Sequence, residues 1–319
     1  MRVAVTGASG FVGQAVTTAL LSSQHNVHAV VRSPDKNASG LAQGIQTLSV
    51  GDIIADTNWM SALAGVDCVV HCAARTHIFN ETETDSLAAY RAVNVEGTLQ
   101  LAEQAAKMGV RRLIYLSSIK VDFDQTASAG CVNSLNKSFT KDPYAISKWE
   151  AEQALHEVSA KTSLEVVIIR PPLVYGPGVK GNFLSMLGWL NRGVPLPLGA
   201  IQNRRSLVGI DNLVNLIVTC IDHPAAANQI FLVSDGEDLS TTELVRQMGT
   251  ALGTPARLIP VPATLLGLAA RMAGKQEVAE RLLGNLQVNI SKTKETLGWA
   301  PLVSMEDGFK KTATWYLSQ

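Results

Sequence analysis

The sequence is poor in cysteine, in net charge and in long apolar runs, and each shortage excludes a class of protein. Its four cysteines in 319 residues contain no C-x-x-C pair, which argues against a disulfide framework and fits a reducing, cytoplasmic location. The 27 Lys and Arg balance the 27 Asp and Glu, so no basic excess indicates a nucleic-acid partner. The stretch 258–274 is interrupted by two prolines and Arg271, and it falls short of the ~20 apolar residues of a membrane span. We expect no integral membrane span, and we interpret this stretch as a buried or oligomer-facing helix, with a membrane-surface helix as the alternative.

A metal site is also not expected. Cys68, His71 and Cys72 lie in or at the end of an expected buried strand. The alternation of side chains along a strand points Cys68 and His71 to opposite faces, so they do not converge on one ion.

What is present begins with "VTGASGFVG", residues 5–13, where three glycines recur at three-residue spacing. A β-branched run precedes them and an apolar helical pattern follows, so they lie at a strand-to-helix turn. Glycine there permits a tight turn and a close approach of the backbone to a ligand. The helix N-terminus favours an anion, which makes a phosphate-binding turn the functional interpretation and an ordinary tight turn the alternative.

Strand and helix patterns alternate along the first half of the chain. Strands are expected at 2–6, 27–31, 46–50, 68–72, 112–117 and 166–170, and helices from 11, at 59–64, at 87–108 and at 143–160. Short apolar strands separated by helices predict an α/β fold with a Rossmann-type, doubly wound parallel sheet.

The pattern of the sequence changes near residue 175, where shorter helices and proline-rich turns begin. We expect a dinucleotide-binding domain over 1–175 and a smaller α+β substrate domain over 176–319, with a late strand near 229–233 able to rejoin the first sheet. The polar stretch from Ser118 to Asp142 is a predicted lid or substrate loop.

A second motif carries proton chemistry. Tyr144 and Lys148 in "YAISKWEAE" are four residues apart, so they lie on one face of the expected helix. A cation beside a phenol favours the phenolate, which would let Tyr144 exchange a proton near neutral pH; a surface Tyr/Lys pair is the alternative. Ser117 and Ser118 end a strand at the carboxyl edge of the sheet, where such folds bind ligands.

Together these motifs resemble the extended short-chain dehydrogenase/reductase family. The similarity includes T-G-x-x-G-x-x-G, the serine pair and Y-x-x-x-K, and it continues in "GDI", "HCAA", "NVEGT", "RPPLVYGPG" and "TKETLGWAP" across nearly the whole chain.

The resemblance implies a role for each matching residue. Ser118 would hydrogen-bond the reacting oxygen, Tyr144 would be the general acid or base, and Lys148 would lower the pKa of the tyrosine. Asn94 would shape the central helix. The implied cofactor contacts are Gly7, Gly10, Phe11, Val12, Gly13, Arg32, Asp52, Ile53, Ala73, Ala74, Tyr144, Lys148 and Pro171.

Within the family, the chain is most similar to the nucleotide-sugar branch of UDP-sugar 4-epimerases and 4-keto-sugar reductases. Asn182 and Arg205 match that branch, and they imply substrate contacts together with Ser118, with Arg205 on the diphosphate. Ser206 and Gly209 replace the acidic and histidine positions of the epimerase pattern, and Asp122-Phe123 replaces the usual Y-G. Ile119 and Lys120 stand where sugar dehydratases carry an acidic pair, which argues against dehydration.

Cofactor choice rests on Arg32 at the end of the second strand, where folds that bind NAD usually carry an acidic residue ~20 residues after the glycine turn. A guanidinium can pair with the 2′-phosphate of NADP, so NADP(H) is favoured; NAD(H) is the alternative, with Asp35 as the acidic residue. NADP(H) favours a reductase of a UDP-4-keto-6-deoxy-N-acetylhexosamine in polysaccharide biosynthesis. A UDP-sugar 4-epimerase with tightly bound NAD is the alternative, and a non-catalytic dinucleotide-sensing protein is a distant one. The resemblance also implies a homodimer formed through the helices at 87–108 and 143–160.

Overall fold

The structure is a computed structural model that describes residues 1–33, 45–76, 85–122 and 142–319. Asp35, Phe123, Cys131 and most of the expected loop between Ser118 and Asp142 lie outside the described residues.

The described residues contain ten strands, eleven α-helices and three short 3₁₀ or π segments, and strands and helices alternate through the first half of the chain. The strands are β1 (Arg2–Thr6), β2 (Asn26–Val31), β3 (Gln46–Ser49), β4 (Cys68–His71), β5 (Arg112–Leu116), β6 (Glu165–Arg170), β7 (Leu173–Tyr175), β8 (Arg205–Gly209), β9 (Ile230–Leu232) and β10 (Asp238–Leu239). The α-helices are α1 (Phe11–Ser22), α3 (Ser86–Arg91), α4 (Gly97–Lys107), α5 (Pro143–Lys161), α6 (Gly181–Asn191), α7 (Ile210–Asp222), α8 (Thr241–Ala251), α9 (Ala263–Met272), α10 (Gln276–Leu283), α11 (Ser291–Leu297) and α12 (Met305–Leu317). Three short segments complete them: the π-helix η1 (Ala92–Glu96) and the 3₁₀ helices η2 (Ile119–Asp122) and η3 (Pro224–Ala226).

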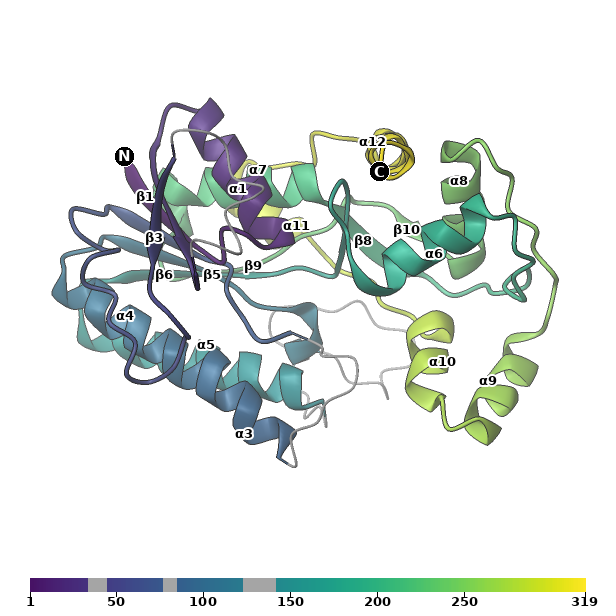
Figure 1. The fold of residues 1–319 in the computed structure, drawn as a ribbon, viewed down its shortest axis with the longest axis horizontal. Coiled ribbons are helices and arrows are strands. Elements are labelled where there is room, and N and C mark those ends of the chain that lie inside the picture. Colours follow the sequence, from purple (N-terminus) through teal and green to yellow (C-terminus); the bar gives the residue numbers. More distant parts are fainter. Residues whose placement is uncertain (34–44, 77–84, 123–141) are drawn as a thin grey trace.

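A seven-stranded sheet forms the centre of the molecule, in the order β3-β2-β1-β4-β5-β6-β9 (Figure 1). Every neighbouring pair in it is parallel. The chain moves outward from β1 in one direction and then in the other, so the predicted doubly wound sheet is confirmed. The change of direction lies between β1 and β4, and the carboxyl ends of the strands meet there at one edge.

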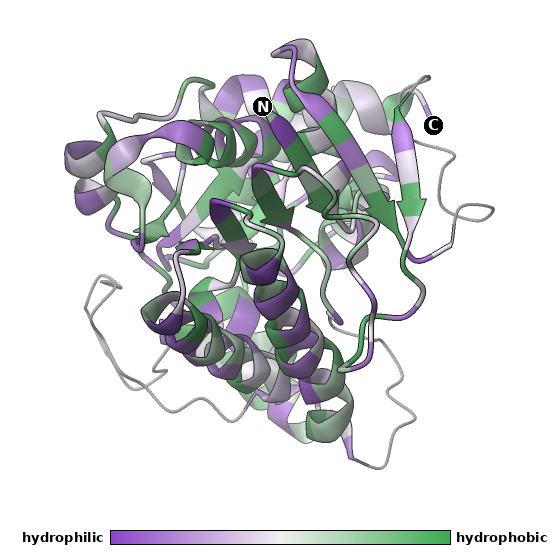
Figure 2. Cartoon of the chain, turned by 90° about the vertical axis from the view of Figure 1, so that its left-hand side faces the viewer, coloured by the Kyte–Doolittle hydropathy of each residue, from purple (hydrophilic) through white to green (hydrophobic). Residues whose placement is uncertain are grey.

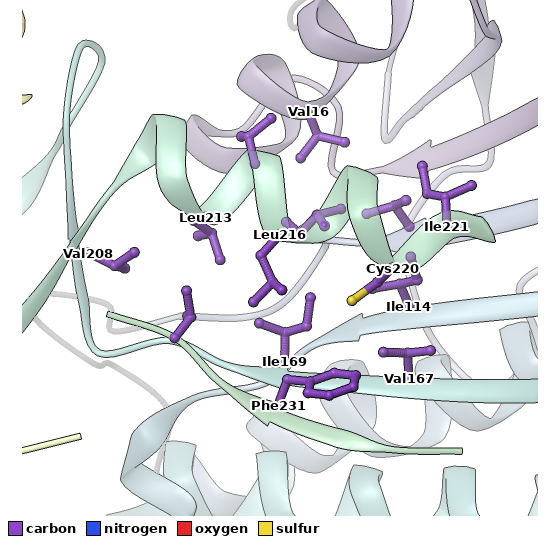
Figure 3. Close-up of a cluster of buried hydrophobic side chains, with 14 of the residues drawn as sticks. Val16, Ile114, Val167, Ile169, Val208, Leu213, Leu216, Cys220, Ile221 and Phe231 are labelled. Carbon is purple, nitrogen blue, oxygen red and sulfur yellow. The ribbon is translucent and has the colours of Figure 1, made fainter. Parts of the chain in front are cut away.

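Helices cover both faces of this sheet. In Figure 1, α1, α7 and α11 lie on one face and α3, α4 and α5 on the other. Figure 3 shows the core under α7, where Leu213, Leu216 and Cys220 meet Ile169 and Phe231 from the sheet. The middle residues of β4 and β6 are hydrophobic, with polar or charged residues at the strand ends, and Figure 2 shows green on the strands of the sheet, as expected for strands that are covered on both faces.

Two of the expected helices differ in the structure. Residues 60–65 form a turn in place of the helix expected at 59–64: Gly65 adopts a φ of +63°, and the Gln104 side chain binds the backbone of Thr57 and Trp59. The helix expected at 87–108 consists of α3 and α4 joined by the π-helical turn η1, in which the Asn94 side chain is buried.

The second half of the chain adds a three-stranded sheet in the order β10-β8-β7, with α6, α8, α9 and α10 around it (Figure 1). Strand β9 leaves this half and pairs with β6 in the seven-stranded sheet. The division into two domains near residue 175 stays a prediction. In the described part of the chain, no helix is both long enough and apolar enough to cross a membrane.

Candidate active site

The glycine turn lies against the chain that follows β4. Gly7 has a φ of +65°, and a side chain there would approach the Ala73 nitrogen to 2.8 Å. A side chain at Gly13 would overlap the Gly7 carbonyl oxygen, while the Gly10 nitrogen donates to that same oxygen at 2.8 Å. Each glycine therefore occupies a place that a larger residue cannot take without movement of the backbone.

The N-terminus of α1 opens directly from this turn. Gly10 is the N-cap, and it supplies no side-chain acceptor for the first N–H groups of the helix, which begins with Phe11 and Val12. Uncapped N–H groups at a helix start favour an anion such as a pyrophosphate. Gly178 of the "RPPLVYGPG" segment approaches the Phe11 ring, so this segment borders the turn.

Tyr144 and Lys148 lie in the first two turns of α5, as predicted, beside the end of β5. Asp142 caps the helix and accepts from the Tyr144 nitrogen at 3.0 Å. The Tyr144 phenol is hydrogen-bonded to Ser118. Lys148 Nζ donates to the Leu116 carbonyl at 2.8 Å and lies 4.4 Å from the centre of the Tyr115 ring. The structure thus brings the three expected catalytic residues to one edge of the sheet.

The electrostatics of this cluster are dominated by burial. Burial raises the pKa of Tyr144 above its usual value, Asp142 raises it further, and the Ser118 hydrogen bond acts against both. Burial lowers the pKa of Lys148 to about 7, against the negative charge of Glu152. The spacing alone predicts a lowered pKa for Tyr144. The pKa is raised because burial of the phenol outweighs the Ser118 hydrogen bond, while the Lys148 ammonium is directed at Leu116 and Tyr115.

A buried polar network that the sequence analysis missed lies beneath the cluster. Glu152, one turn after Lys148, accepts from Ser117 Oγ at 2.5 Å and from two nitrogens of Arg170. Arg170 also donates to Asp122 at 2.6 Å. The sequence contains one sign of this network: Glu152 is eight residues after Tyr144, so it lies on the same face of the helix as Tyr144 and Lys148.

Two further contacts lie beside the cluster. Lys120 forms an ion pair with Asp142 at 2.6 Å and lies 5.6 Å from the centre of the Tyr144 ring. The Asn94 amide binds both the nitrogen and the oxygen of Arg75 and reaches Ser147 on α5, so it joins η1 to two neighbours.

The other expected cofactor residues border the same edge. The Ala73 nitrogen donates to the Thr6 hydroxyl oxygen at 3.3 Å, Ala74 follows Ala73 in the chain, and the Pro171 carbonyl accepts from the Ile119 nitrogen at 3.0 Å. Ile53 lies against Gly97 at the start of α4.

Arg32 at the end of β2 forms an ion pair with Asp52 at 3.3 Å, and both side chains are about three-quarters exposed (74% and 75%). The structure therefore places a carboxylate beside the guanidinium on which the NADP(H) preference was based.

The two expected substrate residues lie outside this cluster. Asn182 is exposed in the first turn of α6, and Arg205 begins β8. Arg205 donates to the Gly284 carbonyl at 2.9 Å, and burial lowers its pKa.

His71 is hydrogen-bonded to two hydroxyls, and the neighbouring Cys68 and Cys72 are held as neutral thiols by burial. The His71 ring lies between the hydroxyls of Thr6 and Thr98, at 2.6 and 2.9 Å, and burial lowers its pKa to about 3. Burial raises the pKa of the Cys68 and Cys72 thiols to about 12. Among the described residues, no three His, Cys, Asp or Glu side chains are grouped as metal ligands.

Comparisons with known proteins identify the family of the chain and show structures with the same fold. The model of the NAD dependent epimerase/dehydratase family matches residues 3–234. The chain belongs to this family. UDP-glucose 4-epimerase of Vibrio cholerae is 47% identical over 317 residues, which are 99% of this chain and 95% of that protein.

Two solved structures confirm the fold. One is UDP-glucose 4-epimerase of Thermotoga maritima with UDP-glucose, at a TM-score of 0.81 and 21% identity over 100% of this chain and 99% of that one. The other is UDP-glucuronic acid 4-epimerase of Bacillus cereus in complex with NAD, at a TM-score of 0.80 and 20% identity over 99% and 96%.

The family membership confirms the predicted extended short-chain dehydrogenase/reductase resemblance and the prediction of an enzyme. The findings favour the epimerase alternative over the reductase, and they support NAD for the family and give no support to the NADP(H) preference.

Proposed function

We propose that this protein is a UDP-sugar 4-epimerase that works with tightly bound NAD. The observation that carries the proposal is the cluster of Tyr144, Lys148 and Ser118 at the carboxyl edge of the sheet, in a chain that is 47% identical to a UDP-glucose 4-epimerase. Inversion at C4 needs one group that removes and returns the hydroxyl proton, and Tyr144 has the chemistry for it.

The residues that surround the glycine turn fit a dinucleotide. Gly7, Gly10 and Gly13 form a tight turn that leads into the uncapped start of α1, where a pyrophosphate would bind, and Asp52 and Ile53 would border the adenosine. When bound, NAD would supply the hydride acceptor and a positively charged nicotinamide ring that favours the phenolate form of Tyr144.

The chain's own groups divide the remaining work. Ser118 would hold the reacting oxygen, Tyr144 would take its proton and give it back, and Lys148 would hold the nicotinamide ribose. Arg205 would pair with the diphosphate of UDP and Asn182 would contact the sugar nucleotide, which assigns substrate binding to residues 176–319. To bind the diphosphate, Arg205 would have to give up its hydrogen bond to the Gly284 carbonyl.

Asp52 supports the choice of NAD over NADP. Its carboxylate already neutralises Arg32, so the guanidinium is not left as an unopposed site for a 2′-phosphate.

The test is to incubate the purified protein with UDP-glucose without added cofactor and to separate the UDP-hexoses by chromatography. We expect UDP-glucose and UDP-galactose to interconvert, and NAD to be released when the protein is denatured. Stoichiometric oxidation of NADPH by a UDP-4-keto sugar, with no interconversion of UDP-hexoses, would instead support the reductase.

A further inference from the structure

One face of α5 contacts three consecutive residues at the carboxyl end of β5: Leu116, Ser117 and Ser118. The three pairs, spaced by four residues on the helix, are Tyr144 with Ser118, Lys148 with the Leu116 carbonyl, and Glu152 with Ser117. The first two pairs belong to the proposed proton-transfer site. The third pair has no assigned role, and the side chain of Glu152 in this pair is wholly buried.

Glu152 is held in place from its other side. Arg170 at the end of β6 donates Nε to Glu152 Oε1 at 3.0 Å and Nη2 to Oε2 at 2.5 Å. The remaining Arg170 nitrogen binds Asp122 at the end of η2, the segment that follows Ser118. The bidentate Arg170 contact fixes the Glu152 carboxylate, and together with the Asp122 contact it links α5, β6 and η2 around Ser117.

The charge of Glu152 bears directly on Lys148. The titratable or charged groups that face Lys148 are Tyr144 and Glu152 from α5, His71 and Cys72 from the end of β4, and Tyr115 from β5. The histidine and the thiol are neutral near pH 7, because burial lowers the pKa of His71 to about 3 and raises that of Cys72 to about 12. Among these described groups, Glu152 is therefore the one that brings negative charge near pH 7.

We propose that Glu152 is a positioning residue for the Tyr144–Lys148 pair: it fixes Ser117, and thereby Ser118, and it keeps the buried Lys148 ammonium charged. A neutral Lys148 would have one N–H donor fewer with which to hold the nicotinamide ribose. The inference rests on the proposed function, because it assigns Glu152 to the same site.

The test uses Glu152→Gln, which keeps the shape of the side chain and removes its charge. The matched control is Glu157→Gln on the same helix, whose carboxylate is 72% exposed and pairs with Lys161. The proton affinity of Lys148 is measured by NMR titration of protein labelled at lysine Cε, with Lys148→Arg to assign the signal.

In Glu152→Gln we expect the pKa of Lys148 to fall by about one unit or more, and the alkaline limb of kcat to move to lower pH by a similar amount. Glu157→Gln should change neither. An unchanged Lys148 titration and an unchanged pH profile in Glu152→Gln would overturn the inference. The titration needs no substrate, so a wild-type protein that fails to interconvert UDP-hexoses would refute the proposed function alone.

Two further variants keep the inference testable. Ser117→Ala retains the charge of Glu152 and removes its hold on the serine, so kcat should fall while the Lys148 titration stays in place. If Glu152→Gln does not fold, Glu152→Gln/Arg170→Met/Asp122→Asn removes every charge of the buried Glu152–Arg170–Asp122 group, and the same fall in the Lys148 pKa is expected.

Discussion

Tyr144 is the residue on which the proposed chemistry depends most. It is partly buried, it is hydrogen-bonded to Ser118, and its pKa is raised by burial. Replacing it with Phe removes the only atom that can exchange the proton and keeps the ring. We expect kcat to fall by about 10²–10⁴-fold, the usual range for loss of a general acid or base, with little change in the melting temperature.

The matched control is Tyr316→Phe in α12, far along the chain from the cluster, which should retain wild-type kcat. Chromatography of UDP-hexoses and thermal unfolding of both variants check the prediction. A Tyr144→Phe protein with wild-type kcat would show that another group transfers the proton.

The sequence predicts the placement of the expected catalytic residues better than it predicts their surroundings. The four-residue spacing of Tyr144 and Lys148 follows from helix geometry, so it can be recognised without a structure. The partners of Glu152 cannot be found this way, because Ser117 and Arg170 come from other elements, 35 and 18 residues away. The direction in which the pKa of Tyr144 is shifted cannot be predicted from the sequence either, because it depends on the burial of the phenol and on where the Lys148 ammonium points.

At the scale of elements, the junction of β1 and α1 sets the position of the proposed cofactor site. A side chain at Gly13 would overlap the Gly7 carbonyl oxygen, so Gly13→Ala must push α1 away from the turn. We expect it to lose most of its bound NAD and to destabilise the protein by about 1–3 kcal/mol, the usual cost of overpacking.

Gly267→Ala is the matched control in α9, where a new Cβ would meet its nearest atom, Leu283 Cδ1, at an ordinary 3.9 Å. It should keep its NAD and gain up to about 1 kcal/mol, because alanine is the better helix former. Nucleotide release on denaturation and urea unfolding measure both effects. Full retention of NAD by Gly13→Ala would contradict the assigned role of the turn.

The regular elements follow from local patterns, and the exceptions follow from tertiary contacts. Strands of β-branched residues between helices were recognisable because both faces of each strand are buried. The turn at 60–65 differs from the expected helix because Gln104, from α4, binds the backbone beside it. The π-helical turn η1 has a comparable cause: its buried Asn94 bridges Arg75 and Ser147, which no local pattern encodes.

At the scale of the whole molecule, the helices at 87–108 (α3, η1 and α4) and 143–160 (within α5) remain the expected dimer interface. Trp149 on α5 is 45% exposed, so this part of the expected interface carries a large apolar side chain that is accessible to a partner. We expect sedimentation equilibrium to give a homodimer and Trp149→Asp to give a monomer, because burying a charge in such an interface is costly.

Trp189→Asp on α6 is the control, because Trp189 is similarly exposed, at 50%, and lies on the other half of the chain. It should remain dimeric. A monomeric wild-type protein at micromolar concentrations, or a dimer that survives Trp149→Asp, would refute this interface.

The reaction catalysed by the whole chain is the central claim, and an isotope experiment tests it most directly. UDP-glucose deuterated at C4 is incubated with the protein without added cofactor, and the UDP-galactose formed is analysed by mass spectrometry. The account predicts that the product keeps the deuterium at C4 and that no NADPH is required, because an epimerase returns the hydride to the same carbon. Failure to form UDP-galactose, together with stoichiometric consumption of NADPH on a UDP-4-keto sugar, would contradict it.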